Sequence, residues 1–239
     1  MENIILKNVQ EKYPECLDRE TFKDDGLGGC NVYGDPGSEC PKMWRYLVDK
    51  YNIKSVLDVG CGFGFHLKYF KDFMGLKVKG VEGSKKVQEL SFFPKLIINH
   101  DYSSGPLILN EGFDLCWSIE FVEHVGEQYS ENFIKTFQGC KYLLMTFATK
   151  GQGGYHHVNE NSKEYWVDKL DNYGFSLNEN ETSIIRERAL EDFNDFKAWQ
   201  KLPDDEKPER GVASLYNKDV GFLLPHVPEC GLFFTNDNP

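Results

Sequence analysis

The chain of 239 residues lacks several features that would place it in a special class of protein. It has no uninterrupted apolar run near the roughly 20 residues that a membrane-spanning helix needs. Its N-terminus has neither the basic start nor the small-residue cleavage site of a secretory signal. Its seven cysteines include no C-x-x-C pair, which argues against a zinc site and a disulfide framework. These absences predict a soluble, cytoplasmic protein with free thiols.

Positive charge is also scarce. Lys and Arg total 27 against 38 Asp and Glu, which gives a formal net charge of −11, and no local cluster of basic residues is visible. A surface of this sign repels a phosphate backbone. We therefore expect no nucleic-acid partner and no membrane span, and we look for a small-molecule ligand instead.

What the sequence does have is a regular alternation of two kinds of apolar segment. Short runs rich in β-branched or aromatic residues alternate with helix-like stretches; the runs are 55–59, 77–82, 95–101, 113–120 and 141–149, and the stretches are 66–74, 85–93 and 132–140. This alternation is typical of βαβ units. It predicts an α/β fold with a doubly wound, mostly parallel sheet, helices on both faces, and five strands before Lys150.

The segments on either side of this pattern are less regular. Residues 1–42 carry scattered Gly, Pro, Asp and Cys and are expected to be a loop-rich N-terminal segment, a candidate cover for a site. Residues 43–239 are expected to form one domain, with additions around 182–230 on the side where specificity would be set. Residues 231–236, GLFFTN, are a candidate last strand that closes an edge of the sheet.

A glycine-rich turn follows the first expected strand. Gly60, Gly62 and Gly64 alternate with Cys61 and Phe63, and glycines are needed where backbone N–H groups and a helix N-terminus must approach a ligand closely. The turn therefore predicts a nucleotide-type ligand. A dinucleotide fingerprint requires glycine at Phe65, so a nicotinamide dehydrogenase is only the runner-up.

Acidic residues end the next two expected strands. Glu82 at the end of the second strand is placed to accept hydrogen bonds from both ribose hydroxyls of a nucleoside. At the end of the third strand, Asp101 can accept from an adenine amine and Tyr102 can stack on the ring. Open α/β sheets bind ligands at the C-terminal ends of their strands, so these residues and the glycine turn are expected to form one site.

The motifs VLDVGCGFG, VEGS, NHD and FDLCWSIEFVEHV, spread over roughly residues 43–180, resemble those of class I S-adenosylmethionine-dependent methyltransferases. The resemblance implies the Rossmann-like methyltransferase fold, with seven strands of which the last is antiparallel, and S-adenosylmethionine as cofactor. It also implies that the first motif holds the amino acid part of the cofactor, while Glu82 binds the ribose and Asp101 contacts the adenine. The full expected cofactor set is Asp58, Gly60, Cys61, Gly62, Glu82, Gly83, Asp101, Tyr102 and Ser118.

Histidines mark the expected acceptor side. Methyl transfer from a sulfonium is an in-line displacement, and an oxygen nucleophile gains from a general base such as histidine. His156 and His157 follow a glycine-rich loop after the fifth strand. Neighbouring side chains on an extended segment point in opposite directions, so we expect one of them to face the acceptor and favour His157. His124, in the E-H-V sequence after the fourth strand, is the third catalytic candidate, although a structural role or a place near the cofactor is favoured for it.

Two other interpretations of these histidines stay open. The loop histidines can simply pack or cap. A metal site would need a third ligand, for which Glu120 and Glu123 are conceivable, and we assign no metal site from the sequence.

The acceptor is constrained by two further segments. The fourth strand is not followed by the Asn or Asp, Pro-Pro and aromatic sequence of enzymes that methylate nucleic-acid bases, which disfavours that activity. Residues 153–175, GGYHHVNENSKEYWVDKLDNYGF, resemble methyltransferases that accompany glycosyltransferases in glycan assembly, and this resemblance implies transfer to a sugar hydroxyl. The alternatives are another small acceptor, such as a phenol, carboxylate or amine, and a catalytically inactive cofactor-binding interaction module.

Overall fold

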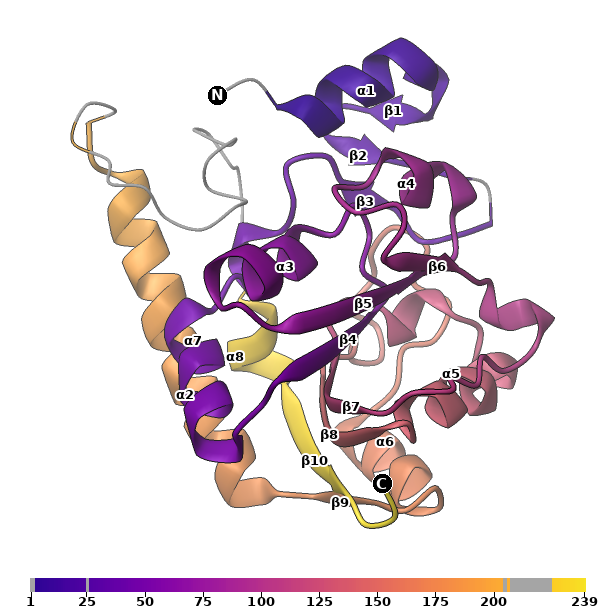
Figure 1. Ribbon diagram of the computed structural model, residues 1–239, viewed down its shortest axis with the longest axis vertical. Coiled ribbons are helices and arrows are strands. Elements are labelled where there is room, and N and C mark those ends of the chain that lie inside the picture. The colour runs from indigo at the N-terminus through magenta and orange to yellow at the C-terminus, as the bar shows by residue number, and fades with distance from the viewer. Residues whose placement is uncertain (1–2, 25, 204–205, 207–224) are drawn as a thin grey trace.

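The structure is a computed structural model that describes residues 3–24, 26–203, 206 and 225–239. A seven-stranded sheet forms its centre (Figure 1). The strands are β4 (Ser55–Val59), β5 (Lys77–Glu82), β6 (Ile97–Asn99), β7 (Phe113–Ser118), β8 (Cys140–Met145), β9 (Phe175–Leu177) and β10 (Leu232–Asn236).

The order of the strands confirms the expected fold class. Across the sheet they run β6-β5-β4-β7-β8-β10-β9, and the first five are mutually parallel. β10 is antiparallel to both β8 and β9, so residues 231–236 do contain the expected antiparallel strand. The chain starts at β4, winds outward to β6 and returns to β7. The winding therefore reverses between β4 and β7, which is where open α/β sheets bind ligands.

Helices cover both faces of this sheet (Figure 1). One face carries α2 (Pro41–Tyr51), α3 (Phe65–Lys68) with the π-helical turn Tyr69–Phe73, α7 (Glu179–Gln200) and α8 (His226–Cys230), and the other carries α5 (Ser130–Phe137) and α6 (Lys163–Asp171). Side chains alternate along each strand accordingly. Val56 of β4 lies in the core under α2 and α7, whereas Leu57 and Val59 lie in the core under α5 and α6.

The start of α2 shows how the two outer helices are joined. Pro41 occupies the first turn, and no side chain of the preceding residue caps the helix. Instead, the carboxylate of Asp192 on α7 accepts hydrogen bonds from the backbone N–H groups of Lys42 and Met43, at 3.0–3.2 Å. These are two of the N–H groups that a helix leaves without an internal partner, so α7 supplies the cap of α2.

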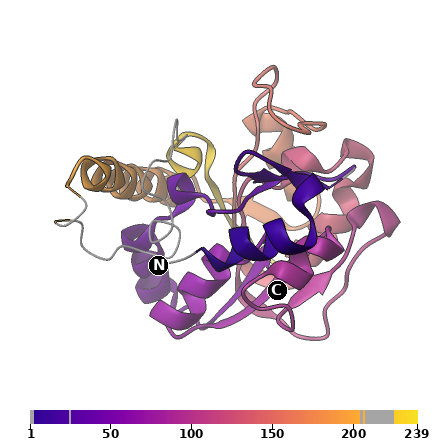
Figure 2. The same ribbon diagram turned by 90° about the horizontal axis from the view of Figure 1, so that it is seen from above.

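The N-terminal segment is more regular than its expected loop-rich character. It contains α1 (Ile4–Lys12) and a small antiparallel sheet of β1 (Leu17–Asp18), β2 (Thr21–Phe22) and β3 (Cys30–Asn31). These elements pack on α3 and on α4 (Lys85–Leu90) through a shared apolar cluster (Figure 2). Strands of two residues are too short to produce a periodic pattern, which is why the sequence did not indicate them.

The C-terminal additions are described in part. Of the addition expected around 182–230, residues 182–200 belong to α7. Residues 204–205 and 207–224 lie outside the described residues. Within the part that is described, no helix has both the length and the apolar character needed to cross a membrane. All seven cysteines are described, and each is a free thiol.

Candidate active site

The glycine-rich turn after β4 depends on backbone conformations that favour glycine. Gly60, Gly62 and Gly64 have φ angles of 82°, 52° and 82°. A Cβ atom on Gly60 would lie 2.5 Å from the ring of Phe121. The N–H groups of Gly60 and Cys61 donate to the carbonyl of Val81, so the turn is held against the end of β5.

Glu82 at the end of β5 is fixed by this turn. One carboxylate oxygen accepts from the N–H of Gly62 at 3.0 Å and the other from the N–H of Ser84 at 2.8 Å. Each oxygen keeps lone-pair capacity for a further donor. Burial raises the pKa of Glu82, and the backbone donors at Ser84 and Gly62 oppose that shift. The carboxylate is thus held rigidly, with acceptors left for a ligand.

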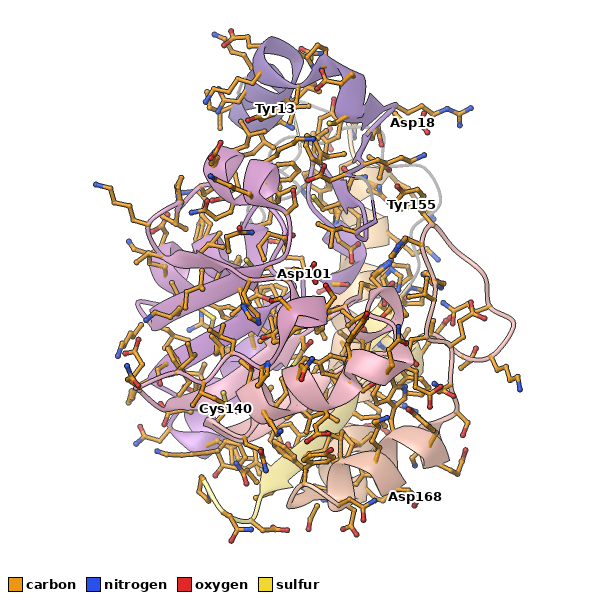
Figure 3. The ribbon with its side chains drawn as sticks, turned by 90° about the vertical axis from the view of Figure 1, so that its right-hand side faces the viewer. Tyr13, Asp18, Asp101, Cys140, Tyr155 and Asp168 are labelled. Carbon is orange, nitrogen blue, oxygen red and sulfur yellow. The ribbon has the colours of Figure 1, made fainter. Side chains whose placement is uncertain are left out.

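A cleft opens along this edge of the sheet. The expected cofactor residues that line it are Gly60, Gly62, Glu82, Gly83, Asp101 and Tyr102. Its other wall is Leu27, Gly28, Gly29 and Cys30 of the N-terminal segment. Within residues 1–42, expected as a candidate cover for a site, residues 27–30 lie against this cleft. The Gly-Gly-Cys run is the feature of the sequence that marks this stretch. In Figure 3, Asp101 lies between the N-terminal elements at the top and Cys140 of β8 below.

The remaining residues of the expected cofactor set do not line this cleft. Asp58 at the end of β4 is 2% exposed, and one of its carboxylate oxygens has no hydrogen-bond partner in the part of the chain that is described. Burial, and then the charge of Glu82, raise the pKa of Asp58. Ser118 is fully buried and donates to the carbonyl of Val59. Cys61 lines a neighbouring cavity instead.

Asp101 and Tyr102, the two residues expected at the adenine, differ in their exposure and in the contacts they already make. Asp101 is exposed, but both of its carboxylate oxygens accept hydrogen bonds from Ser103, one from the N–H and one from the hydroxyl. Tyr102 is 3% exposed, and its ring packs edge-on against Phe121 and Phe133. Tyr102 is thus largely a core residue whose ring forms part of the floor of the cleft.

A second cavity adjoins the cleft. The two share Gly29, Cys30, Gly60, Gly62, Glu120 and His124. The second cavity adds polar side chains that the cleft lacks, including Asn31, Asp35, His66 and His226, and the rings of Phe63 and Phe65. A molecule in the second cavity would therefore lie next to a ligand bound at the glycine turn.

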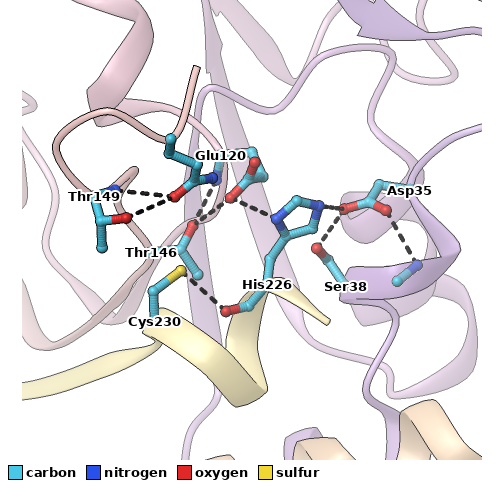
Figure 4. Close-up of polar contacts among 9 residues, drawn as sticks. Asp35, Ser38, Glu120, Thr146, Thr149, His226 and Cys230 are labelled. Atoms are coloured by element: carbon cyan, nitrogen blue, oxygen red, sulfur yellow. Dashed lines mark hydrogen bonds and ion pairs between the residues drawn. The ribbon is translucent and has the colours of Figure 1, made fainter. Parts of the chain in front are cut away.

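Three ionisable residues from distant segments meet in this cavity (Figure 4). Nδ1 of His226 lies 3.0 Å from a carboxylate oxygen of Glu120, and Nε2 lies 3.9 Å from Asp35. Burial opposes a charge on His226, but Asp35 and Glu120 outweigh it and raise its pKa to about 9. Burial likewise opposes ionisation of Glu120, yet the hydrogen bond from His226 holds its pKa below the usual value. The three place a partly buried imidazolium between two carboxylates.

Glu120 also has an unusual backbone. Its φ angle is 52°, a left-handed conformation that is uncommon for residues other than glycine. The hydroxyl of Thr146 accepts from the N–H of Glu120 at 2.8 Å and donates to its carboxylate at 3.1 Å. Strained backbone of this kind concentrates at functional sites. The sequence analysis considered Glu120 only as a conceivable metal ligand and missed Asp35, His66 and His226.

His124 is the predicted acceptor-side residue that lines both cavities. Its Nδ1 lies 3.2 Å from the backbone carbonyl of His156. Because a carbonyl oxygen can only accept, Nδ1 must carry the proton, and Nε2 of the neutral ring keeps a free lone pair. Burial, together with the neighbouring His157, lowers the pKa of His124 to about 4.

His156 and His157 line neither cavity. The ring of His157 is 10% exposed, lies 3.4 Å from the carboxylate of Glu160, and packs edge-on against His124 with ring centroids 5.2 Å apart. The ring of His156 stacks parallel to His124 at 6.5 Å, and its own φ angle is 55°. The structure thus places the two loop histidines around His124.

The loop that carries these histidines is fastened to the turn that carries His124. The N–H groups of Val158 and Asn159 both donate to the carbonyl of Glu123, at 2.8 and 3.1 Å. The buried side-chain amide of Asn159 donates to the carbonyls of Val122 and Val125. The two segments, more than 30 residues apart in sequence, therefore form one unit.

Glu123 lies inside this unit. Its side chain has no exposed surface, and neither carboxylate oxygen has a hydrogen-bond partner among the described residues. Burial, followed by the charge of Glu120, raises the pKa of Glu123 to about 8.

Residues 57–144 match the protein-family model described as "Methyltransferase domain". The match runs from β4 to β8 and includes the glycine turn, Glu82, Asp101 and His124. A comparison with curated proteins finds no match.

Solved structures of methyltransferases share the general outline of the fold. A magnesium protoporphyrin IX methyltransferase from Synechocystis PCC 6803, solved with bound S-adenosylmethionine, is 18% identical over 74% of this chain and 88% of that chain, with a TM-score of 0.48. The glycopeptide N-methyltransferase MtfA, solved with the same cofactor, is 14% identical over 62% and 86%, with a TM-score of 0.46. A methyltransferase from Archaeoglobus fulgidus is 19% identical over 59% and 70%, with a TM-score of 0.44.

At these identities and TM-scores the three structures carry no information on the acceptor of this chain. The match of residues 57–144 to the methyltransferase model covers the five parallel strands β4 to β8 and the glycine turn that borders the cleft at the end of β4. Residues 57–144 thus form a methyltransferase domain on a Rossmann-like sheet, and the chain acts as an S-adenosylmethionine-dependent methyltransferase.

Proposed function

We propose that the chain transfers the methyl group of S-adenosylmethionine to a hydroxyl oxygen, and that the acceptor is a sugar of a glycan or a related small molecule. The polar character of the second cavity carries this proposal, because three histidines and two carboxylates line it beside the glycine turn. Many hydroxyl groups on one acceptor need many donors and acceptors in the pocket. The flanking rings of Phe63 and Phe65 suit the apolar face of a sugar ring.

The residues around the first cleft fit the cofactor. Gly60 and Gly62 let the ligand approach the backbone, and Glu82 can accept from the ribose hydroxyls. Asp58 does not line the cleft, so its expected contact with the amino acid part stays a prediction. When bound, S-adenosylmethionine supplies a methyl group on a positively charged sulfur. The expected roles of Cys61, Gly83, Asp101, Tyr102 and Ser118 stay predictions.

On the acceptor side, we assign His124 to the position beside the acceptor hydroxyl. Transfer forms an O–C bond and breaks the S–C bond, whose electron pair stays on sulfur, and the hydroxyl proton passes to solvent water. Of the three predicted histidines, His124 is the one that lines both cavities. His156 and His157 then act as positioning residues, because one holds the tautomer of His124 and the other packs on its ring. A cytoplasmic location, which keeps thiols reduced, suits the seven free cysteines.

The first test is calorimetric titration with S-adenosylmethionine. The variant Glu82→Gln keeps the shape of the side chain but replaces an acceptor oxygen with a donor, so we expect its affinity to fall by about 10- to 100-fold. The matched control is Glu131→Gln, an exposed glutamate on α5 that pairs with Lys135, which should bind like the wild type. Equal affinity in all three proteins would refute the assigned cofactor site.

The second step is an acceptor screen that starts with oligosaccharides. His124→Ala should bind S-adenosylmethionine but lose most of its turnover. Turnover on phenols, carboxylates or amines and not on sugars would refute the glycan acceptor and keep the methyltransferase. Cofactor binding without turnover on any acceptor would favour the inactive interaction module.

A further inference from the structure

We propose that Glu123, His124 and His157 bind a divalent first-row transition-metal ion, such as Zn²⁺ or Co²⁺, which holds and activates the acceptor hydroxyl. The juxtaposition of these three side chains carries the inference: each offers a ligand atom, and these atoms lie within 4.8 Å of one another. The proposed role in catalysis rests on the proposed function; the binding site itself does not.

Glu123 is the observation that points to a missing partner. A fully buried carboxylate whose two oxygens lack hydrogen-bond donors is costly, so such groups usually pair with a charge or coordinate a metal. The imidazoles of His124 and His157 can each offer one nitrogen ligand beside this carboxylate.

The surroundings of both histidines match those of metal ligands. A metal-binding histidine usually donates its other ring N–H to a carbonyl or a carboxylate, which fixes the ring. His124 does this through Nδ1 to the carbonyl of His156, and the carboxylate of Glu160 lies 3.4 Å from Nδ1 of His157. Glu160 is itself held by the N–H groups of Gly151 and Gly153.

The ligand set indicates the class of metal. Two imidazoles and one carboxylate suit zinc and its first-row neighbours, whereas magnesium and calcium prefer sets made of oxygen. Three protein ligands also leave coordination positions open, as in catalytic zinc sites. His124 borders the cofactor cleft and the second cavity, so a hydroxyl that filled an open position would lie between them. A cation there would lower the pKa of that hydroxyl and orient it.

This cluster supplies the third ligand that the sequence alone did not identify. Glu123 and His124 come from the turn after β7, and His157 comes from the loop after β8. The hydrogen bonds from Val158 and Asn159 to the carbonyl of Glu123 fix the two segments together before any ion is bound. The site is therefore preformed.

The test measures binding of the metal alone. The full-length protein is treated with a chelator, dialysed, and titrated with Co²⁺, whose visible absorption reports its coordination, and then with Zn²⁺ as competitor. We expect one Co²⁺ per chain, displaced by Zn²⁺, and at least tenfold weaker binding in Glu123→Gln and in His157→Ala. The control His66→Asn, which removes a histidine of the second cavity outside the cluster, should bind Co²⁺ like the wild type.

Calorimetry with S-adenosylmethionine on the same samples shows that each variant is folded and tests the proposed function separately. No Co²⁺ or Zn²⁺ binding by a wild-type protein that does bind S-adenosylmethionine would overturn the metal site. Undiminished Co²⁺ binding in both cluster variants would also overturn it. Metal binding without cofactor binding would instead refute the proposed function and leave the metal site standing.

Discussion

At the level of single residues, the histidines of the second cavity differ in what their ring nitrogens can do. His226 is held as a cation by Asp35 and Glu120, whereas Nδ1 of His66 accepts a hydrogen bond from the indole of Trp117 at 3.1 Å. A nitrogen that accepts cannot also carry a proton, so protonation of His66 at Nδ1 would break this contact. Burial accordingly lowers the pKa of His66 to about 4.

This contact predicts a loss of stability in acid. The pKa of His66 is lower in the folded protein than its ordinary value of 6.5, so the unfolded chain binds the extra proton first. The contribution is present in full above pH 6.5 and is lost as the pH falls towards 4. Because His66 is partly exposed, we expect about 2 kcal/mol of unfolding free energy to be involved.

Urea denaturation at several pH values checks this prediction. His124 also titrates with a lowered pKa, so the informative quantity is the difference between wild type and His66→Asn. The variant should be less sensitive to acid between pH 6.5 and 4. Parallel stability profiles of the two proteins would show that His66 does not contribute.

At the level of the elements, the cap of α2 by α7 makes one carboxylate important to both helices. Asp192 is fully buried and binds two N–H groups at the start of α2. The variant Asp192→Ala would leave these groups without their partner, and we expect the unfolding free energy to fall by about 2 kcal/mol. Asp195, one turn further along α7, pairs with the exposed ammonium of Lys42.

The matched control is therefore Asp195→Ala, for which we expect a change below about 0.5 kcal/mol. Denaturant unfolding followed by tryptophan fluorescence measures both variants, since Trp44 of α2 is buried in the core. Equal losses in the two variants would contradict the role of Asp192 as a cap.

The elements also show how far the sequence can predict this fold. The long apolar runs of β4, β5, β7 and β8 and the amphipathic helices between them were readable, because each repeats a local pattern. The three-residue strand β6 was predicted from its place in the alternation of strands and helices, whereas the equally short β9 lies outside that alternation and has no period of its own. The same limit applies to the two-residue strands of the N-terminal segment.

The candidate site likewise has one part that the sequence predicts and one part that it does not. The glycine turn and Glu82 occupy fixed places after consecutive strands, so their proximity follows from the topology. The contact between Glu120 and His226 joins residues 106 positions apart and requires the return of the chain through α8. The left-handed backbone of Glu120 and the unpartnered buried carboxylate of Glu123 are likewise properties of the packed molecule.

At the level of the whole molecule, the N-terminal segment and the sheet form opposite walls of the cofactor cleft. Binding of S-adenosylmethionine should therefore slow hydrogen exchange at residues 26–30 as well as at the glycine turn, while α1 should change little. A Cβ atom on Gly28 would lie 2.7 Å from the ring of His124, so Gly28→Val should separate the walls and weaken this protection. Exchange mass spectrometry measures both effects, and protection confined to the glycine turn would contradict the prediction.

The position of the cleft between two separate parts of the chain has one more consequence. Residues 27–30 line it on one side and the glycine turn and Glu82 on the other, so a bound ligand would contact both parts of the chain and act as a removable crosslink between them. A ligand that binds only the folded chain adds about 2.7 kcal/mol to its stability at one hundred times the dissociation constant. The lifetime of the protein in a cell would then follow the supply of the methyl donor, and methyl starvation would reduce the amount of enzyme as well as its turnover.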